Sequence, residues 1–233
     1  MLIKHLSFKF NKNSNHYFFR DITFQFDSKQ AYFIQGDNGI GKSTLFNILQ
    51  GLSEQNAYLD TSLSLDGMAY NSYNNMLPKS FTKQVHTVQQ NYDTMIANQF
   101  SFIDNLRLSA MAHYPNLKFL PQATLFDIIK PLNIDINKKV SLLSGGQRQL
   151  LAILMALQKP TKLLLLDEPT ATLDKKNSRI IMDFLFRISK ELNLIILIIC
   201  HDKELINEYP QSIKIGIEKL ANDERVMAIH SSI

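Results

Sequence analysis

The chain has 233 residues and a formal net charge of +4. This length allows one large domain, and the weak charge, without a long Lys/Arg block, does not indicate nucleic-acid binding. The single cysteine, Cys200, excludes a framework of disulfide bonds. No apolar stretch approaches the roughly 20 residues that a membrane-spanning helix needs, and residues 1–6 do not resemble a signal peptide. We therefore expect another chain to supply any membrane part.

The first third of the chain alternates between strand and helix patterns. Apolar residues at every second position predict strands near 6–10 and 22–26, and residues 31–34 predict a third strand that leads to Gly36. A helix follows, and Gly51 is placed to act as its C-cap. Residues 53–84 are rich in Asn, Ser and Tyr, and strands are expected near 59–65 and 85–88.

The rest of the chain indicates the fold class. Residues 99–139 have a helical pattern broken by prolines, and a long helix is expected from Ser144 to about Gln158. Residues 163–166 and 194–199 predict buried strands on either side of a helix over 175–192. This alternation with continuous apolar strands predicts an α/β fold with a parallel sheet covered on both faces.

A phosphate-binding loop lies between the third strand and the first helix. Residues 36–43 match the P-loop pattern G-x-x-x-x-G-K-S/T completely. Backbone N–H groups of such a loop converge on phosphate oxygens, and the helix N-terminus adds a positive dipole end. Lys42 is expected to reach the β- and γ-phosphates, and Ser43 to bind Mg²⁺. The predicted ATP-binding residues here are Gly36, Asp37, Asn38, Gly39, Ile40, Gly41, Lys42, Ser43 and Thr44.

Two carboxylates, Asp167 and Glu168, stand at the end of an apolar strand. The carboxyl end of a parallel strand faces the nucleotide crevice in folds of this kind. An Asp at this place holds Mg²⁺ in P-loop NTPases, and Glu168 could accept a proton from the attacking water. Without the phosphate loop this pair would be read as a solvated strand end; with the loop it indicates a P-loop NTPase.

A second motif narrows the class. Residues 143–149, Leu-Ser-Gly-Gly-Gln-Arg-Gln, resemble the signature motif of the ATP-binding cassette (ABC) ATPases. Gln90 resembles the Q-loop glutamine of that family, residues 171–174 its D-loop, and His201 its H-loop histidine. The resemblance covers essentially the whole chain. It implies a RecA-like core with an antiparallel β edge (residues 1–90 and 159–233) and a helical subdomain (residues 91–158).

The resemblance also implies a dimer. Ser144 is a natural N-cap, and the two glycines after it let an anion approach the helix start. In the family, this segment of one subunit closes over the ATP held by the phosphate loop of the other. A head-to-tail dimer with a second copy or a paralogous ABC ATPase is therefore implied, in which Asp174 acts across the interface. The ATP-binding residues of the signature are Ser144, Gly145, Gly146 and Gln147.

Catalytic roles follow from the same resemblance. Glu168, His201, Gln90 and Lys42 are the implied catalytic residues, and Ser43, Gln90 and Asp167 the implied Mg²⁺ ligands. Phe10 resembles the aromatic residue that stacks on adenine. An ordinary core role for Phe10, and stacking by Tyr17 or Phe18 instead, both stay open at this point, because stacking needs only an aromatic face.

Departures from the family pattern are small. The turn at residues 27–30 lacks the glycine common there, and Ala171-Thr172 replaces the more common Ser-Ala pair of the D-loop. Neither change removes a charged group or a catalytic position, so an active ATPase is expected.

The implied function is that of the ATP-hydrolysing subunit of an ABC membrane transporter. The sequence of the chain is most similar to ATPases of tryptophan/tyrosine and basic-membrane-lipoprotein type uptake systems. This similarity favours amino-acid-type uptake. Such a subunit is cytoplasmic and is held at the inner face of the membrane by transmembrane permease subunits. Part of the set Phe100, Phe102, Ile103 and Leu106 is expected in the core, and part in a groove of the helical subdomain that receives the permease.

Three alternatives remain open. The first is a soluble ABC ATPase that serves a non-transport assembly, such as iron–sulfur assembly. The second is the ATPase of a lipid or lipoprotein export complex. The third is a module that binds ATP without turnover, against which Glu168 and His201 argue.

Overall fold

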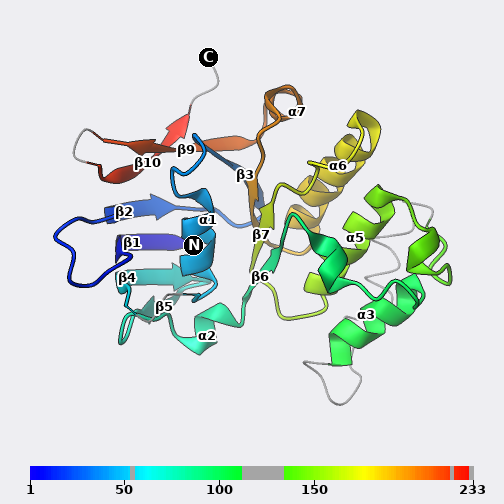
Figure 1. Cartoon of the computed structure of the whole chain (residues 1–233), viewed down its shortest axis with the longest axis horizontal. Helices are drawn as coiled ribbons and strands as arrows, with labels where there is room; N and C mark the ends of the chain where they lie inside the picture. The colour runs from blue at the N-terminus through cyan, green and yellow to red at the C-terminus, as the bar shows by residue number, and fades with distance from the viewer. Residues whose placement is uncertain (53–55, 112–133, 221–222, 231–233) are drawn as a thin grey trace.

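The computed structural model describes residues 1–52, 56–111, 134–220 and 223–230. Its strands form one ten-stranded sheet in the order β5-β4-β1-β2-β10-β9-β3-β8-β7-β6. Figure 1 shows the antiparallel strands at one end of the molecule and α3, α5 and α6 at the other. The strands are β1 (Leu2–Lys9), β2 (Phe19–Gln25), β3 (Gln30–Gln35), β4 (Tyr58–Leu65), β5 (Met68–Asn71), β6 (Val85–Val88), β7 (Leu163–Asp167), β8 (Ile195–Ile199), β9 (Ile213–Lys219) and β10 (Arg225–His230).

The described helices are mostly short, and none of them is long and apolar enough to cross a membrane. They are α1 (Lys42–Leu49), α2 (Lys79–Thr82), α3 (Phe102–Met111), α5 (Gly145–Ala156), α6 (Lys175–Glu191) and α7 (Lys203–Asn207), with 3-10 helices η1 (Tyr92–Met95) and η3 (Val140–Leu142).

The parallel part of the sheet is buried on both faces. Strands β3, β8, β7 and β6 run parallel to one another, as their registers show. Leu163 and Leu165 of β7 belong to the core cluster that contains α1, while Leu164 and Leu166 belong to the cluster that contains α5 and α6. Successive side chains of a strand point to opposite faces, so each face of β7 has its own helical cover. The predicted α/β architecture is confirmed, and it is the P-loop NTPase arrangement with an antiparallel β edge.

Several local predictions are confirmed and others need correction. Strands β4 and β6 lie where residues 59–65 and 85–88 predicted them. The C-cap of helix α1 is Gln50 and not the predicted Gly51. Gly51 is the residue after the C-cap and lies at φ 75°. Strands β5, β9 and β10 and helix α7 were not predicted. Strand β5 pairs with the preceding β4 and β10 with the preceding β9, whereas the pairings of β9 with β3 and of β10 with β2 join distant parts of the chain.

The helical pattern expected over residues 99–139 is only partly correct. Helix α3 lies within it, but residues 134–139 form turns instead of helix. Asp135 is the local reason, because its side chain accepts from the N–H of Asn137 at 3.0 Å and its carbonyl accepts from Lys138 at 3.2 Å. The three prolines of this pattern lie outside the described residues. The division into a core and a helical subdomain over 91–158 stays a prediction.

The turn before β3 has no glycine, and Lys29 takes its place in the left-handed region at φ 63°. A side chain with a Cβ is strained there, whereas glycine is not. We expect Lys29→Gly to raise the free energy of unfolding by up to about 1 kcal/mol. Lys29→Asn should gain part of that amount, because asparagine tolerates this conformation. Urea unfolding of the variants measures the effect, and a loss of stability in Lys29→Gly would contradict the strain argument.

Candidate functional site

The phosphate loop has the backbone conformation that its glycines permit. Gly36 and Gly41 lie at φ 142° and 121°, and Gly39 at φ 77°. A Cβ added at Gly36 would lie 2.8 Å from the carbonyl oxygen of Ile217. No side chain fits between the loop and β9, so the loop packs on the sheet through bare backbone. The loop ends at α1, whose first residue is Lys42.

Lys42 is held by its own loop. Its Nζ donates to the carbonyl oxygens of Gly36 at 2.7 Å and Asp37 at 3.0 Å, and the residue is only 7% exposed. Burial lowers the pKa of Lys42, while the nearby Asp37, Glu168 and Asp167 act in the opposite direction. The structure thus presents a desolvated cation at the base of the loop. An anion bound there would favour the charged form of the Lys42 amine.

The acidic pair lies at the carboxyl end of β7, beside β8. Asp167 is in register with Ile199, and the N–H of Glu168 donates to the carbonyl of Ile199 at 2.9 Å. Glu168 adopts φ 49°, which is uncommon for a residue with a side chain and costs conformational energy. Burial raises the pKa of Asp167, and the adjacent Glu168 raises it further.

One cavity gathers side chains from four distant segments. It has a volume of about 280 Å³ and is lined by the phosphate loop and α1, the second residue after β6, the end of β7 and the end of β8. Nε2 of His201 lies 3.3 Å from Oε1 of Glu168 across this space. The cavity is lined by Asn38, Gly39, Gly41, Lys42, Ser43, Thr44, Gln90, Asp167, Glu168, Ile199 and His201.

Three other predicted residues of the loop do not line this cavity. Gly36 and Asp37 line a neighbouring one of about 480 Å³, which also reaches Lys42 and His201. The side chain of Ile40 is buried in the core cluster that contains α1, so it could serve a ligand only through its backbone.

The cavity offers oxygen ligands that suit a hard cation. Ser43, Gln90 and Asp167 supply a hydroxyl, an amide oxygen and a half-buried carboxylate on its wall. Divalent magnesium prefers such oxygen donors and usually completes its shell with substrate phosphates and water. Within the described residues no group of three or more His, Cys, Asp or Glu could hold a metal ion by itself. The donor set therefore fits a cation that arrives with a polyphosphate.

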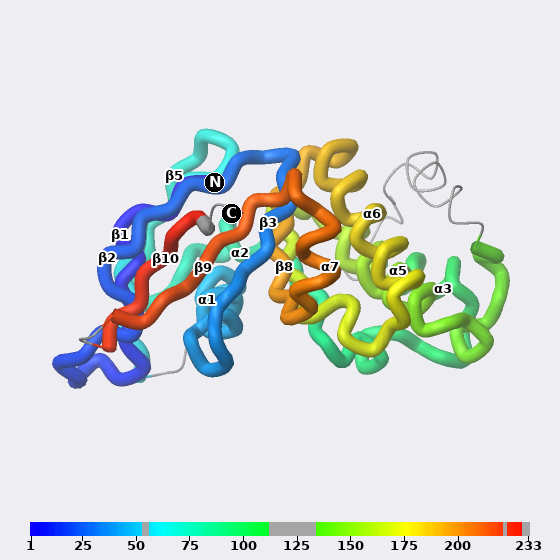
Figure 2. The backbone as a smooth tube through the Cα atoms, turned by 90° about the horizontal axis from the view of Figure 1, so that it is seen from above, coloured from blue at the N-terminus to red at the C-terminus, as the bar shows by residue number. Residues whose placement is uncertain are grey.

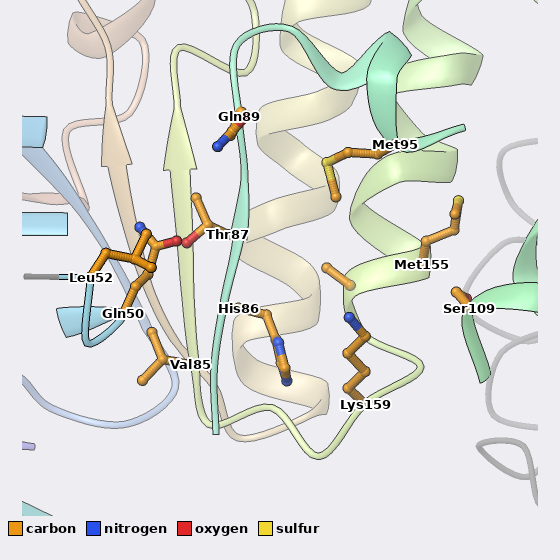
Figure 3. Close-up of a pocket in the computed structure, with 11 residues that line it drawn as sticks. Gln50, Leu52, Val85, His86, Thr87, Gln89, Met95, Ser109, Met155 and Lys159 are labelled. Carbon is orange, nitrogen blue, oxygen red and sulfur yellow. The ribbon is translucent and has the colours of Figure 1, made fainter. Parts of the chain in front are cut away.

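Two neighbouring glutamines line two different cavities. Gln90 lines the cavity at the phosphate loop, whereas Gln89 lines a larger one of about 560 Å³ beyond β6. Figure 3 shows this second cavity, with Gln89 at one end and Met95 and Met155 along one side. Both residues follow directly after β6, so one short piece of backbone separates the two cavities.

The signature segment begins helix α5 and lies apart from the cavity in the same chain. Ser144 and Gln147 form a reciprocal capping box, in which Gln147 N–H donates to Ser144 Oγ at 3.3 Å and Ser144 N–H donates to Gln147 Oε1 at 3.1 Å. The hydroxyl of Tyr92 donates to the carbonyl of Gly145 at 3.2 Å. No residue from Ser144 to Gln147 lines the 280 Å³ cavity. The structure does not bring the two phosphate-binding segments together within one chain.

The aromatic residues of the β1–β2 turn separate into two groups. Tyr17 is engaged by cations, since Lys9 Nζ lies 4.3 Å and Arg20 Cζ 5.5 Å from its ring centroid. Phe10 is 45% exposed, just past the end of β1, and its ring meets that of Phe18 edge to face at 4.8 Å. The exposure of Phe10 is not that of an ordinary core residue. Phe18, which contacts Phe10, also lies against Gly41 of the loop together with the buried Phe19.

Asp174, expected to act between subunits, has a defined role within the chain. Its side chain accepts from the N–H and the Nδ2 of Asn177, both at 2.8 Å, and so caps α6. Hydrogen bonding from Asn177 lowers the pKa of Asp174.

Sequence reasoning missed two features of the site. The left-handed conformation of Glu168 has no sequence signal, because neither glycine nor asparagine occupies the position. The contact between Arg225 and Phe18, with Cζ 3.9 Å from the ring centroid, joins residues 207 positions apart (225 − 18). Only the pairing of β10 with β2 brings them together.

The comparison with protein families agrees with this geometry. The family model described as ABC transporter matches residues 19–171, which include the phosphate loop, the signature and the acidic pair. The chain belongs to the ABC transporter family. It is an ATP-binding subunit of this class and an ABC-type ATPase.

The names of known relatives refer to different transported substrates. The chain is 31% identical over 195 residues to the lipoprotein-releasing system ATP-binding protein LolD of Buchnera aphidicola subsp. Schizaphis graminum, covering 82% of each. It is 31% identical over 199 residues to a tyrosine transport ATP-binding protein of Clostridioides difficile, covering 82% of this chain and 77% of the relative. It is 28% identical over 208 residues to the phosphonates import ATP-binding protein PhnC 2 of Oceanobacillus iheyensis, covering 85% and 80%.

Solved structures share the fold. CbiO1 from Clostridium perfringens, part of the transporter complex cbiONQ, superposes with a TM-score of 0.68 at 23% identity, covering 96% of this chain and 85% of that one. The ATP-binding cassette MJ0796, a dimer bound to ADP and phosphate, gives 0.66 at 22% identity, covering 96% and 95%.

Proposed function

We propose that the chain hydrolyses MgATP in a head-to-tail dimer and drives an ABC membrane transporter from the cytoplasmic side. The observation that carries the proposal is the 280 Å³ cavity, where a phosphate loop, an acidic pair, a glutamine and a histidine meet from four segments. Phosphoryl transfer needs mainly positioning and charge stabilisation, and each wall of this cavity supplies a part of that.

The residues have distinct proposed tasks. The loop N–H groups and Lys42 bind the β- and γ-phosphates, and the aromatic surface of Phe10 receives the base. Glu168 accepts a proton from the attacking water, and His201 contacts the γ-phosphate beside it. Ser43, Gln90 and Asp167 would hold Mg²⁺, which neutralises phosphate charge when bound.

The dimer is needed because the signature segment of one chain does not line the nucleotide cavity of the same chain. The start of α5 has backbone N–H groups and a positive dipole end beside an exposed Ser144. In the proposed dimer Ser144, Gly145, Gly146 and Gln147 of each subunit close the ATP site of the other. The second subunit is another copy or a paralogous ABC ATPase.

The larger cavity is the proposed docking groove for the permease. Its wall combines the end of α1, strand β6 and helices α3 and α5, and includes Leu52, which is 60% exposed (Figure 3). Phe102 and Leu106, considered for this groove from the sequence, are buried in the core, whereas Phe100 is exposed and Ile103 only partly buried. None of these four residues lines this cavity, and only Phe100 is largely exposed.

A coupling prediction follows from the neighbouring glutamines. We expect Gln90→Ala, and a charge in the groove through Leu52→Glu, to weaken transport more than MgATP affinity. Gln90 links nucleotide occupancy to the segment next to the groove, and such a link needs different contacts in the bound and free states. Transport in reconstituted vesicles and nucleotide affinity would be measured on the same variants. If both quantities fall in step, the segment is only part of the nucleotide site.

The transported substrate is a separate question with two proposals. Amino-acid-type uptake is supported by the tyrosine transport relative and lipoprotein export by the LolD relative, at the same identity. Purification with the membrane subunit, followed by assays for tyrosine uptake and lipoprotein release, distinguishes them. Absence of any membrane subunit from the purified complex would favour a soluble ABC ATPase instead.

A further inference from the structure

The C-terminal hairpin reaches the base side of the nucleotide site. Strand β10 lies between β9 and β2, with Arg225 in register with Phe19 of β2 and with Lys219 of β9 (Figure 2). Residues from the far end of the chain thus stand beside the β1–β2 turn. No motif in the sequence predicts that these two segments lie side by side.

Arg225 is stacked on an aromatic ring at this place. Its guanidinium carbon lies 3.9 Å from the centroid of the Phe18 ring, well within the range of a cation–π contact. Its Nη1 donates to the carbonyl of Asp223, and its Nε is buried without a hydrogen-bond partner among the described residues. Burying a guanidinium nitrogen in this way carries a cost that the ring contact offsets only in part.

Phe18, the ring that Arg225 contacts, in turn contacts two parts of the nucleotide site. A Cβ placed on Gly41 of the phosphate loop would lie 2.7 Å from Phe18 Cε1, so ring and loop backbone already touch. On another side, the Phe18 ring meets Phe10 edge to face at 4.8 Å and an interplanar angle of 73°. Phe18 therefore supports both the exposed Phe10 ring and the last glycine of the loop.

We propose that Arg225 is a positioning residue of the nucleotide-base site, which holds Phe18 against the edge-to-face partner Phe10 and so makes the C-terminal hairpin part of base binding. This inference rests on the proposed MgATP binding at the phosphate loop. Arg225 acts through the two rings, and the affinity it contributes depends on the ligand having a base. A ligand that has phosphates alone should not sense it.

The test compares a nucleotide with a base-free polyphosphate. We expect Arg225→Ala to raise the Kd for MgATP about three- to tenfold, the loss of a partly buried cation–π contact. The Kd for inorganic tripolyphosphate with Mg²⁺, measured by calorimetry on the same protein, should not change. Arg225→Lys should restore part of the MgATP affinity, because it retains the charge but not the planar group.

A matched control separates the ring contact from the hairpin as a whole. Arg20 Nη1 binds Glu224 Oε1 of the same hairpin at 2.8 Å, and its guanidinium lies over the ring of Tyr17, so Arg20→Ala should leave both Kd values unchanged. A second readout uses the absence of tryptophan from the chain, since Phe10→Trp introduces a single tryptophan at the base site, whose fluorescence can be excited selectively over that of the eight tyrosines. Quenching of Trp fluorescence by MgATP should weaken when Arg225→Ala is added.

Four results would overturn the inference. They are an equal loss of affinity for tripolyphosphate, the same loss in Arg20→Ala, unchanged MgATP affinity in Arg225→Ala, and an unchanged fluorescence response. A protein that binds neither MgATP nor tripolyphosphate before any substitution would instead refute the proposed function itself.

Discussion

Glutamine in place of Glu168 should abolish ATP turnover while MgATP still binds. The amide keeps the size and hydrogen-bonding shape of the carboxylate but cannot accept a proton from water. We expect kcat to fall by about a hundredfold to ten-thousandfold, the usual contribution of a general base. Glu168 is held at φ 49° by the chain around it, so the amide should occupy the same place beside His201.

Phosphate release and size-exclusion chromatography measure this prediction together. The variant should accumulate as an ATP-bound dimer, because closure no longer ends in hydrolysis. Glu191→Gln, at the exposed end of α6, serves as the control with unchanged turnover. Turnover at the unsubstituted rate in the Glu168 variant would show that another group accepts the proton.

Removal of the Lys42 side chain should have its effect one step earlier, on binding. Lys42→Ala takes away a desolvated cation aimed into the loop, and with it a charge-assisted contact to phosphate. We expect MgATP affinity to fall by about a hundredfold or more, since buried hydrogen bonds to charged groups are the strong ones. Calorimetry with MgATP measures the loss.

Thermal unfolding is the companion measurement for Lys42→Ala. The variant also loses hydrogen bonds to the carbonyls of Gly36 and Asp37, but it removes a buried charge whose pKa is lowered by that burial. These effects oppose each other, so we expect little change in stability. Lys4→Ala, on the exposed side of β1, is the control for a simple loss of charge. Unchanged MgATP affinity in the Lys42 variant would overturn the phosphate-loop assignment.

The sequence predicted best what short segments determine. A strand, a glycine-rich loop and a helix in succession leave few alternatives, and the structure has β3, the loop and α1 in that order. The same holds for Ser144, whose capping box with Gln147 depends on residues three positions apart. Buried apolar runs likewise predicted β7 and β8, since their side chains are covered on both faces.

Contacts between distant segments could not be predicted in this way. The hairpin of β9 and β10 has no pattern that says it will pair with β3 and β2. The proximity of His201 to Glu168 depends on the parallel pairing of β7 with β8, and only the family resemblance made it expected. The dimer, the metal ligands and the permease groove remain predictions, since each needs a molecule beyond this chain.

The paired placement of Gln89 and Gln90 has a consequence for how this segment can change in length. Strand β6 ends at Val88, and the two glutamines reach their cavities from the two residues that follow it, where the strand gives way to a bend. Adding residues after Val88 would move both glutamines away from the end of β6 and so away from the cavities that they line. An inserted codon at this place would therefore disturb the connection between the nucleotide cavity and the groove, although every residue of both cavities was still encoded.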